Sequence, residues 1–235
     1  MHRGMGFFRR NEKKERFAED TFVIAGLGNP GKEYENSRHN MGFRALDVLA
    51  SDTGIDVRRA KFQSLIGQGK IAGRKVILVK PQTYMNLSGN AVREVAMYYD
   101  VPSTNVIVIY DDFDLPLESI RIRKSGGPGT HNGMKSVVQQ LGVQDFPRIR
   151  IGVGSPKQSD DTIDFVIGKV PKTEQELLDK AAAEAAKAAY DIVAIGIDNA
   201  MNRHNHAPAK PKKQKPAVSE EAKNSSDTET NQSDI

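Results

Sequence analysis

The amino-acid sequence predicts a single α/β domain built on a twisted mixed, mostly parallel β-sheet that is flanked by helices. Short apolar runs alternate with amphipathic helical stretches between residues 21 and 205. The chain has 235 residues, of which 38% are hydrophobic and 27% charged, so it can bury one sizeable core. No internal repeat is visible, which argues against a solenoid.

The sequence of the first half of this domain predicts one strand, one helix and one hairpin. Residues 21–26, TFVIAG, form a short apolar run that is typical of a buried strand. Residues 40–52 place their apolar side chains along one helical stripe. Residues 61–71 and 74–80 flank the dipeptide Ala-Gly and predict two strands joined by a tight turn.

Further elements follow in order. Ser88 is predicted to cap a helix that carries apolar residues at helical spacing. Residues 105–110, NVIVIY, are the most apolar strand in the chain. Residues 119–124 and 148–154 alternate with period two, which predicts two strands, each with one buried face.

The last elements are helical. Thr173 and Glu176 have the spacing of a capping box and are predicted to open a long Ala-rich helix that ends near Gly196. A short helix over residues 198–204 is expected to follow.

Two terminal segments differ from the domain in composition. Residues 1–20 are polar and are predicted to form a disordered N-terminal extension, with no apolar stretch of the kind found in secretory signals. Residues 206–235 are rich in Pro, Lys, Ser and acidic residues and are predicted to form a disordered, charged C-terminal tail. The tail is basic in its first half, so contact with RNA remains open beside the simpler interpretation of a solvated tail.

Composition limits the function classes. The net charge is +4, but residues 21–205 contain 23 Lys and Arg against 21 Asp and Glu, so overall charge is a weak sign of nucleic-acid binding. The chain has no cysteine, which excludes disulfides, thiolate metal sites and a cysteine nucleophile and fits a cytoplasmic location. No apolar run reaches the roughly 20 residues that cross a bilayer, so no membrane association is expected.

A glycine pattern after the first strand resembles a dinucleotide-binding loop. Gly26, Gly28 and Gly31 have the G-x-G-x-x-G spacing. However, a cofactor site needs a helix to begin at the third glycine, and polar residues, KEYENSRHN, follow Gly31 instead. The loop therefore predicts a tight turn at a strand end, with Asn29 either a turn former or an amide that faces a ligand.

Polar side chains of several loops form a candidate reaction centre. His39 follows the polar segment and is the candidate general base, although an isolated histidine is more often structural. Asn29, Asn86 and Asn132 all lie in loops beside strands or helix starts, where amides can hold a peptide or ester carbonyl. Asp111 directly follows a strand and is expected to orient His39.

A magnesium site at Asp111 and Asp112 is an alternative interpretation of the same strand end. The chain lacks the phosphate loop and the second acidic cluster that would accompany such a site. It also lacks a G-x-S-x-G nucleophile motif. A base with amide donors and no nucleophile favours direct attack by an activated water.

A basic surface is predicted beside the reaction centre. In residues 119–124, Arg121 and Arg123 share one face, and Arg148 and Arg150 share a face of the later strand. The Gly-rich residues 124–133 between them form either an anion-binding loop or an ordinary flexible loop. Arginines that spread along strands fit the phosphates of a structured RNA better than a small phosphate.

Five motifs in order carry a resemblance to one family. The segments are GLGNPGKEYENSRHNMGF, KPQTYMNLSG, YDDFDLP, GGPGTHNGMKS and RIRIGVG. In sequence and order they resemble bacterial-type peptidyl-tRNA hydrolase, over residues 21 to about 205. The resemblance implies a monomeric, metal-free esterase of the cytoplasm that cleaves peptide from the terminal ribose of prematurely released peptidyl-tRNA and so recycles the tRNA.

The resemblance also implies roles for individual residues. His39 would activate water, Asp111 would stabilise its basic form, and Asn29 would sense the peptide and help to reject unblocked aminoacyl-tRNA. The remaining substrate-binding positions are Tyr34, Tyr84, Met85, Asn86, His131 and Asn132 in the cleft and Arg121, Arg123 and Arg150 on the tRNA phosphates.

Two rivals from other classes remain. One is a catalytically silent RNA-binding relative of the same fold, which would keep the arginines without needing His39 and Asp111. The other is a metal-dependent phosphoesterase. The sequence departs from the family pattern at Thr130, which stands where a second glycine is usual, and a β-branched residue disfavours positive φ.

Overall fold

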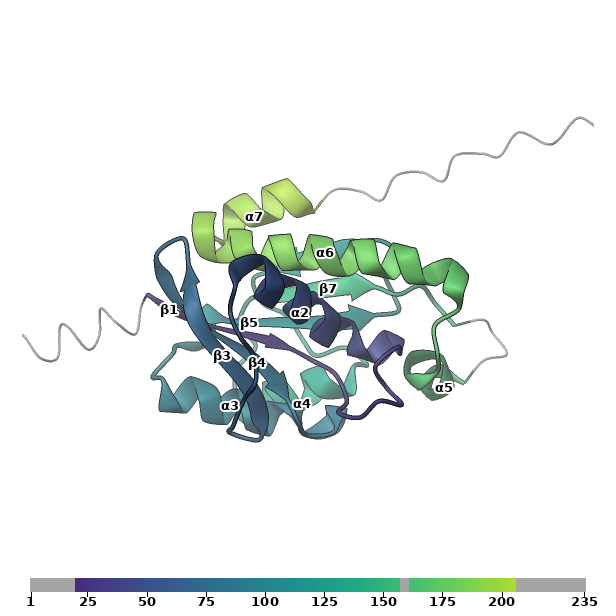
Figure 1. Cartoon of the computed structure of the whole chain (residues 1–235), viewed down its shortest axis with the longest axis horizontal. Coiled ribbons are helices and arrows are strands. Elements are labelled where there is room, and N and C mark those ends of the chain that lie inside the picture. Colours follow the sequence, from purple (N-terminus) through teal and green to yellow (C-terminus); the bar gives the residue numbers. More distant parts are fainter. Residues whose placement is uncertain (1–19, 157–160, 206–235) are drawn as a thin grey trace, which may run out of the picture.

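A seven-stranded mixed sheet in the order β2-β3-β4-β1-β5-β7-β6 forms the centre of the fold (Figure 1). The structure is a computed structural model that describes residues 20–156 and 161–205. The strands are β1 (Thr21–Gly26), β2 (Arg59–Lys61), β3 (Ser64–Ile71), β4 (Arg74–Pro81), β5 (Val106–Asp112), β6 (Ile120–Arg123) and β7 (Arg148–Gly152).

The sheet is mixed, as predicted, with its parallel part in the middle. Strand β1 pairs in parallel with β4 and with β5, and β5 pairs in parallel with β7. The pairs β2–β3, β3–β4 and β6–β7 are antiparallel. Parallel pairing is therefore as frequent as antiparallel pairing rather than dominant, because the hairpin and the short strand β6 extend the parallel centre at its two ends.

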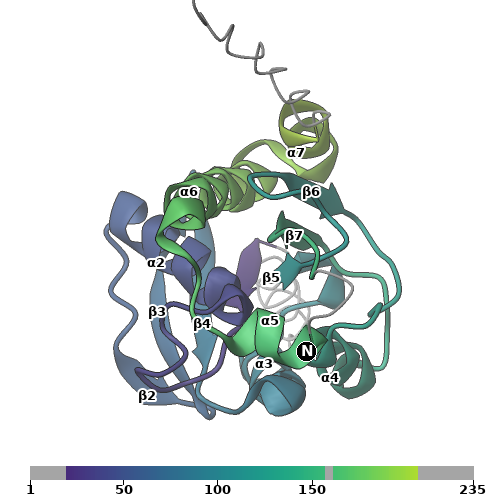
Figure 2. The ribbon, with the colours of Figure 1, turned by 90° about the vertical axis from the view of Figure 1, so that its right-hand side faces the viewer.

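Helices cover both faces of the sheet. They are α2 (Met41–Thr53), α3 (Ser88–Tyr98), α4 (Asn132–Leu141), α5 (Thr162–Ile167), α6 (Lys172–Ile195) and α7 (Ile197–His204), with 3-10 turns η1 (Arg38–Asn40), η2 (Met85–Leu87) and η3 (Ser103–Asn105). Helices α2 and α6 lie on one face and α3 and α4 on the other, while α7 lies beside the edge strand β6 (Figures 1 and 2). None of the helices in the described ranges has the length and apolarity that crossing a membrane requires.

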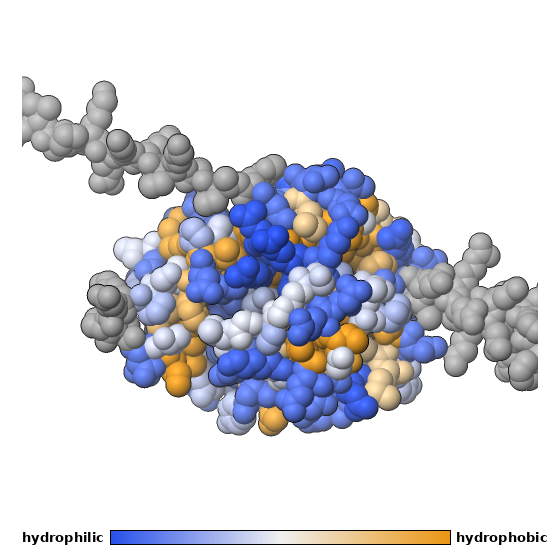
Figure 3. Space-filling model, turned by 180° about the vertical axis from the view of Figure 1, so that it is seen from behind, coloured by the Kyte–Doolittle hydropathy of each residue, from blue (hydrophilic) through white to orange (hydrophobic). Residues whose placement is uncertain are grey.

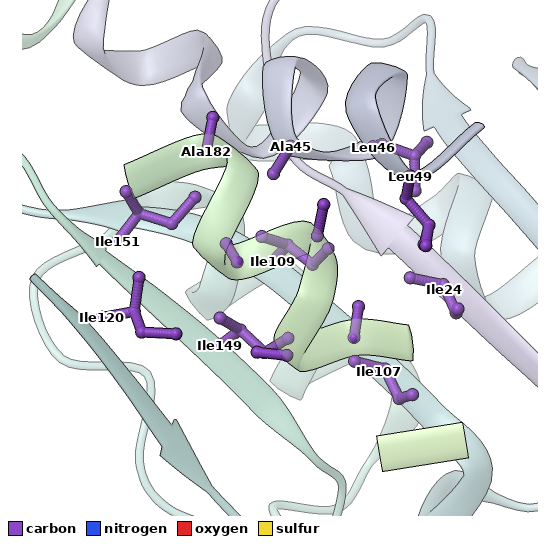
Figure 4. Packing of buried hydrophobic residues seen from close by; sticks show 14 of the residues in the cluster. Ile24, Ala45, Leu46, Leu49, Ile107, Ile109, Ile120, Ile149, Ile151 and Ala182 are labelled. Atoms are coloured by element: carbon purple, nitrogen blue, oxygen red, sulfur yellow. The ribbon is translucent and has the colours of Figure 1, made fainter. Parts of the chain in front are cut away.

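Each face of the sheet buries its own apolar cluster. Figure 4 shows the larger cluster, in which Ile107 and Ile109 of β5 and Ile149 and Ile151 of β7 lie against helix α6. The smaller cluster packs the alternate residues of the same strands, such as Val108, against α3 and α4. The period-two alternation of each strand therefore directs its side chains to two different helix layers.

Close packing between helix and strand explains two glycines near the predicted site. A Cβ at Gly26 would lie 2.2 Å from the Gly42 carbonyl oxygen, and one at Gly42 would lie 2.4 Å from the Ile109 carbonyl oxygen. Helix α2 therefore contacts the backbone of β1 and β5, which no larger residue permits. This packing, rather than a phosphate, accounts for the first glycine of the dinucleotide-like pattern.

Several predicted details of the helices are wrong. Ser88 is the first residue of α3 and does not cap it, because Leu87 occupies the cap position. The capping box is also absent: Pro171 precedes the first turn of α6, and no side chain caps that end. The sequence prediction did not include β2, α4 or α5, whereas the end of α6 before Gly196 is confirmed.

The predictions for the N-terminal extension and for the tail lie outside the described residues, apart from Asp20.

Candidate active site

The candidate site lies where strands β1 and β5 end. Asp111 is the penultimate residue of β5, Asn29 follows β1, and His39 lies in η1 immediately before α2. Neighbouring parallel strands β1 and β5 bring these segments to the same edge of the sheet. The carboxyl edge of an open α/β sheet is a common ligand site.

The Asp111 carboxylate lies between two histidines. His39 Nδ1 is 3.0 Å from both carboxylate oxygens, and His131 Nε2 is 3.1 Å from Oδ1. The Asp111 side chain is only 1% exposed, so its carboxylate meets the two histidines and almost no solvent. This arrangement confirms that Asp111 contacts His39 and adds His131 as a second partner.

The charges of this cluster shift its proton equilibria. Burial by itself lowers the pKa of His39, but the charge and hydrogen bond of Asp111 outweigh burial and leave that pKa above its ordinary value. For Asp111, burial would raise the pKa, yet the two histidines hold it far below its ordinary value. The carboxylate therefore stays ionised and favours protonation of His39.

The hydrogen bonds differ between the two histidines. The backbone N–H of Met134 donates to His131 Nδ1 at 3.2 Å, so His131 caps helix α4 and uses its other nitrogen for Asp111. Both ring nitrogens of His131 are thereby engaged. His39 uses Nδ1 for Asp111, while its Nε2 has no hydrogen-bond partner among the described residues. His39 is therefore the histidine that can accept a proton from water.

Asn29 is held in one orientation by its neighbours. Its Oδ1 accepts the Met85 N–H at 2.7 Å, which assigns the side-chain nitrogen as the free end of the amide. Asn40 holds the Asn29 backbone by accepting its N–H at 2.7 Å and donating to its carbonyl at 3.0 Å. Asn29 is therefore held in one orientation, and its side-chain nitrogen has no hydrogen-bond partner among the described residues.

The other predicted cleft residues are distributed around this centre. Met85 is buried and lies against the start of α4, because a Cβ at Gly133 would be 2.5 Å from Met85 Sδ and 2.9 Å from a His131 ring carbon. Asn86 follows Met85, and Asn132 begins α4 directly after His131; both are exposed. The structure thus places both amides next in sequence to residues of the centre.

The two predicted tyrosines are less closely tied to the centre. Tyr84 precedes Met85 and is 61% exposed. Tyr34 is half-buried in the loop after β1, where its carbonyl accepts the Ser37 hydroxyl at 2.7 Å. Within the described ranges, neither tyrosine ring stacks on His39 or forms a hydrogen bond with it.

Four arginines lie side by side on strands β6 and β7. Arg121 is opposite Arg150, and Arg123 is opposite Arg148. Arg150 Nε donates to Asp112 at 2.5 Å, and Arg123 has no ion pair among the described residues. Like charges directly opposite each other are unfavourable in a sheet, so this surface favours an anion.

Arg148 corrects the prediction that both strands present an arginine pair. Its side chain is 1% exposed and donates to the carbonyl oxygens of Gly126, Gly127, Gln144 and Phe146. Arg148 thus fixes the Gly-rich loop from beneath and is not available to a ligand.

The Gly-rich loop closes one side of a pocket of about 390 Å³. Asp111, His131, Arg123 and Arg150 contribute to its lining together with residues 125–130. In this loop positive φ falls on Gly126 and Gly129, not on Thr130, so the replacement of the usual glycine by Thr130 causes no backbone strain. Figure 3 shows a largely hydrophilic face with a hollow and separate apolar patches.

The donor atoms of His39, Asp111 and His131 lie within 4.8 Å of one another, which is close enough for a metal ion. However, both imidazoles point a nitrogen at Asp111 and Met134 donates to the remaining nitrogen of His131, so only His39 Nε2 keeps a free lone pair. The cluster therefore fits a proton-transfer centre better than a metal centre.

Two residues next to His39 were not singled out from the sequence. Asn40 positions Asn29, as described above. Arg38 is buried, donates to Glu174 at 2.5 Å and lies 4.1 Å from the Phe165 ring centroid, so it ties the segment before His39 to α5 and α6. Their position beside His39 was the available signal, but their partners are distant in sequence.

Comparison with known proteins gives consistent matches. A family model described as peptidyl-tRNA hydrolase matches residues 23–215. Peptidyl-tRNA hydrolases of Thermoanaerobacter sp. (strain X514) and Clostridium botulinum (strain Alaska E43 / Type E3) are 50% and 47% identical over 184 residues, which are 78% of this chain and 99% and 95% of those proteins.

A solved structure is also similar. The crystal structure of peptidyl-tRNA hydrolase from Acinetobacter baumannii has a TM-score of 0.74 and 36% sequence identity, covering 79% of this chain and 94% of that chain.

Proposed function

The chain belongs to the peptidyl-tRNA hydrolase family, and we propose that it cleaves the ester between peptide and tRNA with a water activated by His39. The observation that carries this mechanism is the His39–Asp111 pair, in which Asp111 holds Nδ1 and leaves Nε2 free. The enzyme acts on peptidyl-tRNA released prematurely from ribosomes and so returns the tRNA to use.

Proton transfer through His39 accounts for both halves of the reaction. Nε2 takes a proton as the water oxygen attacks the ester carbonyl carbon, and Asp111 stabilises the imidazolium that forms. The tetrahedral intermediate then expels the ribose oxygen, which takes the proton back from His39. The products are a peptide with a free carboxyl group and a tRNA with an intact terminal ribose.

Amide donors stabilise the developing oxyanion in this mechanism. Asn86 and Asn132 flank the centre on η2 and α4, and neither amide makes a hydrogen bond to another described residue. Fixed donors at the position where charge develops are among the largest contributions to enzymatic rate. Tyr34, Tyr84 and Met85 line the remainder of the cleft.

The orientation of Asn29 explains how the enzyme selects substrates whose amino group is blocked by a peptide bond. Its Oδ1 is held by the Met85 N–H, so its side-chain N–H groups are free to donate to a substrate. A peptide carbonyl accepts from such a donor, whereas the ammonium group of an unblocked aminoacyl-tRNA has only donors and would be left unpaired.

Arg121, Arg123 and Arg150 contact tRNA phosphates in this proposal, and His131 contributes by holding Asp111. The paired arginines of β6 and β7 present positive charge next to the pocket. Guanidinium groups suit phosphate oxygens. We expect a structured RNA to bridge several of them.

The same proposal includes a metal-free reaction, a monomer and a cytoplasmic location. It assigns the activity to residues 21–205, with the extension and the tail as additions of unassigned role. Light scattering coupled to size-exclusion chromatography tests the monomer, and a species of twice the chain mass would contradict it.

Hydrolysis of N-acetyl-aminoacyl-tRNA in excess EDTA tests the mechanism. We expect full activity of the wild type in the chelator and a loss of about 10²- to 10⁴-fold in His39→Ala, the usual contribution of a general base. Loss of wild-type activity in EDTA would favour the metal-dependent phosphoesterase. Equal rates in the two proteins would remove His39 as the base, and no activity in either would favour the silent RNA-binding relative.

A further inference from the structure

The end of helix α7 is joined to the edge strand β6 by one side chain. Asn205 Oδ1 accepts the Ile122 N–H at 2.7 Å, and Asn205 Nδ2 donates to the Ile122 carbonyl at 3.0 Å. The amide therefore occupies the place of a neighbouring strand for one residue. Two hydrogen bonds of this kind fix both the distance and the tilt of the strand edge.

This contact matters because β6 ends the sheet. It pairs on one side only, with β7, and is four residues long. Short edge strands have unpaired backbone groups and fray readily. Asn205 pairs the backbone of Ile122, which lies between the two arginines that we place on the tRNA.

Asn205 also contacts one of those arginines directly. Arg121 Nη1 donates to the Asn205 carbonyl oxygen at 3.3 Å. This bond uses one donor of the guanidinium and leaves the others available. It also offsets part of the repulsion between Arg121 and the opposite Arg150.

The residue before Asn205 anchors the end of α7 to α6. His204 is buried, with Nδ1 2.7 Å from a Glu184 oxygen and Nε2 2.7 Å from an Asp191 oxygen. Arg203 also donates to Asp191, at 2.9 Å. At the other end of the helix, Lys124, next to β6, forms an ion pair with Asp198. Helix α7 is thus fixed to the long helix and to the arginine strand together (Figure 2).

We propose that Asn205 is a positioning residue for tRNA binding, which holds β6 and Arg121 in the geometry that meets the phosphates. This inference rests on the proposed contact between the β6 arginines and tRNA. Asn205 does not touch the reacting atoms. Its effect falls on substrate binding and not on the chemical step.

Asn205→Ala in the full chain tests the inference in steady-state hydrolysis of N-acetyl-aminoacyl-tRNA. We expect KM to rise by roughly threefold to tenfold, the range that one or two net hydrogen bonds imply, with kcat unchanged. Asn205→Gln keeps the amide and is expected to recover part of the loss. Asn202→Ala is the matched control, since Asn202 is an exposed residue of the same helix, and we expect it to match the wild type.

Folding is checked separately from positioning. Hydrogen exchange followed by NMR is expected to show faster exchange of the Ile122 amide in Asn205→Ala, with the core strands β1 and β5 unchanged. If Asn205→Ala lowered kcat as much as it raised KM, or if exchange rose throughout the sheet, a general structural role would replace the proposal.

A double-mutant cycle separates this inference from the proposed function. In an Arg121→Ala, Arg123→Ala background, we expect Asn205→Ala to raise KM much less than in the wild type, because its effect passes through those arginines. An undiminished effect would overturn the inference. If the arginine substitutions raised KM and Asn205→Ala did not, the inference would fail and the tRNA surface would stand. If the arginine substitutions left KM unchanged, the tRNA surface itself would fail and the inference with it.

Discussion

Asp111→Asn is the substitution that most directly tests the proton-transfer centre. It preserves the shape of the side chain and removes a charge that lies 3.0 Å from His39 Nδ1 and 3.1 Å from His131 Nε2. The side chain is 1% exposed, so solvent compensates little for the lost charge. Because Asp111 does not reach the substrate, we expect the effect on kcat and little change in KM.

The expected loss follows from the charge that develops on His39. Two unit charges about 4 Å apart attract by about 4 kcal/mol at an effective dielectric constant near 20. That energy corresponds to about a thousandfold in rate. The Asn carbonyl retains one hydrogen bond to His39 Nδ1, so we expect kcat to fall by about 10²- to 10³-fold.

The pH dependence gives a second measure of the same charge. Activity requires unprotonated His39, whose pKa Asp111 raises above the ordinary value of 6.5, so wild-type kcat/KM rises with pH through a midpoint above 6.5. In Asp111→Asn only burial remains, which lowers the pKa of His39. We therefore expect the midpoint to move to lower pH.

The Asp111 carboxylate also makes the stability of the fold depend on pH. Asp111 has a lowered pKa in the folded protein, so its ionised form stabilises the fold above the ordinary range and this contribution is lost as the pH falls through the lowered value. At neutral pH we therefore expect the thermal midpoint of Asp111→Asn to lie below that of the wild type. This difference is expected to narrow in acid.

The assay is hydrolysis of N-acetyl-aminoacyl-tRNA between about pH 5 and 8.5. Asp112→Asn is the matched control, since Asp112 contacts Arg150 and not His39, and we expect it to leave the midpoint in place. An Asp111→Asn enzyme with kcat within threefold of wild type, or a midpoint displaced to higher pH, would refute the reasoning.

Three further predictions concern packing, the arginines and selectivity. Gly42→Ala places a Cβ 2.4 Å from the Ile109 carbonyl oxygen, so we expect a loss of about 1–3 kcal/mol in the free energy of unfolding, measured by urea denaturation. Arg148→Met is expected to lower the thermal midpoint by roughly 5–10 °C, because it leaves buried carbonyl oxygens unpaired. Arg123→Met is expected to keep the thermal midpoint within about 2 °C of the wild type and to raise KM. The reverse pattern would contradict both assignments. Asn29→Asp keeps the acceptor for the Met85 N–H and replaces the side-chain donor with a second acceptor. We therefore expect the ratio of kcat/KM for blocked over unblocked aminoacyl-tRNA to fall about tenfold. An unchanged ratio would exclude Asn29 as the residue that selects blocked substrates.

The sequence predicts the sheet well because its strands carry strong local signals. Residues 21–26 and 105–110 are uninterrupted apolar runs, and both are central parallel strands. Helix α4, NGMKSVVQQL, directly follows a Gly-rich loop and was not predicted, although Met134, Val137, Val138 and Leu141 are spaced as on one face of a helix. Its cap, His131, was instead interpreted as a substrate contact.

The contacts of the site depend on pairs that are far apart in sequence. Asp111 follows a strand, which predicts its place at the sheet edge, and it meets His39 across 72 positions. That His131 shares the same carboxylate depends on how α4 begins, which local patterns do not reveal. The sequence therefore indicated that His39 and Asp111 meet, but not how the protons of the cluster are arranged.

Strands β6 and β7 show a further limit of prediction from local sequence patterns. Period two places four arginines on one face of β6 and β7, and the observed register confirms that face. The pattern assigns all four the same exposure, yet Arg148 is enclosed by four carbonyl oxygens, Arg150 is paired with Asp112, and Arg123 has no ion pair in the described part of the chain. The partners that neutralise an arginine come from loops whose path the strand period does not determine. Availability to a polyanion therefore follows from tertiary contacts. Among the residues that the structure describes, Arg121, which donates to the Asn205 carbonyl oxygen, and Arg123 are the arginines of this face without an ion pair.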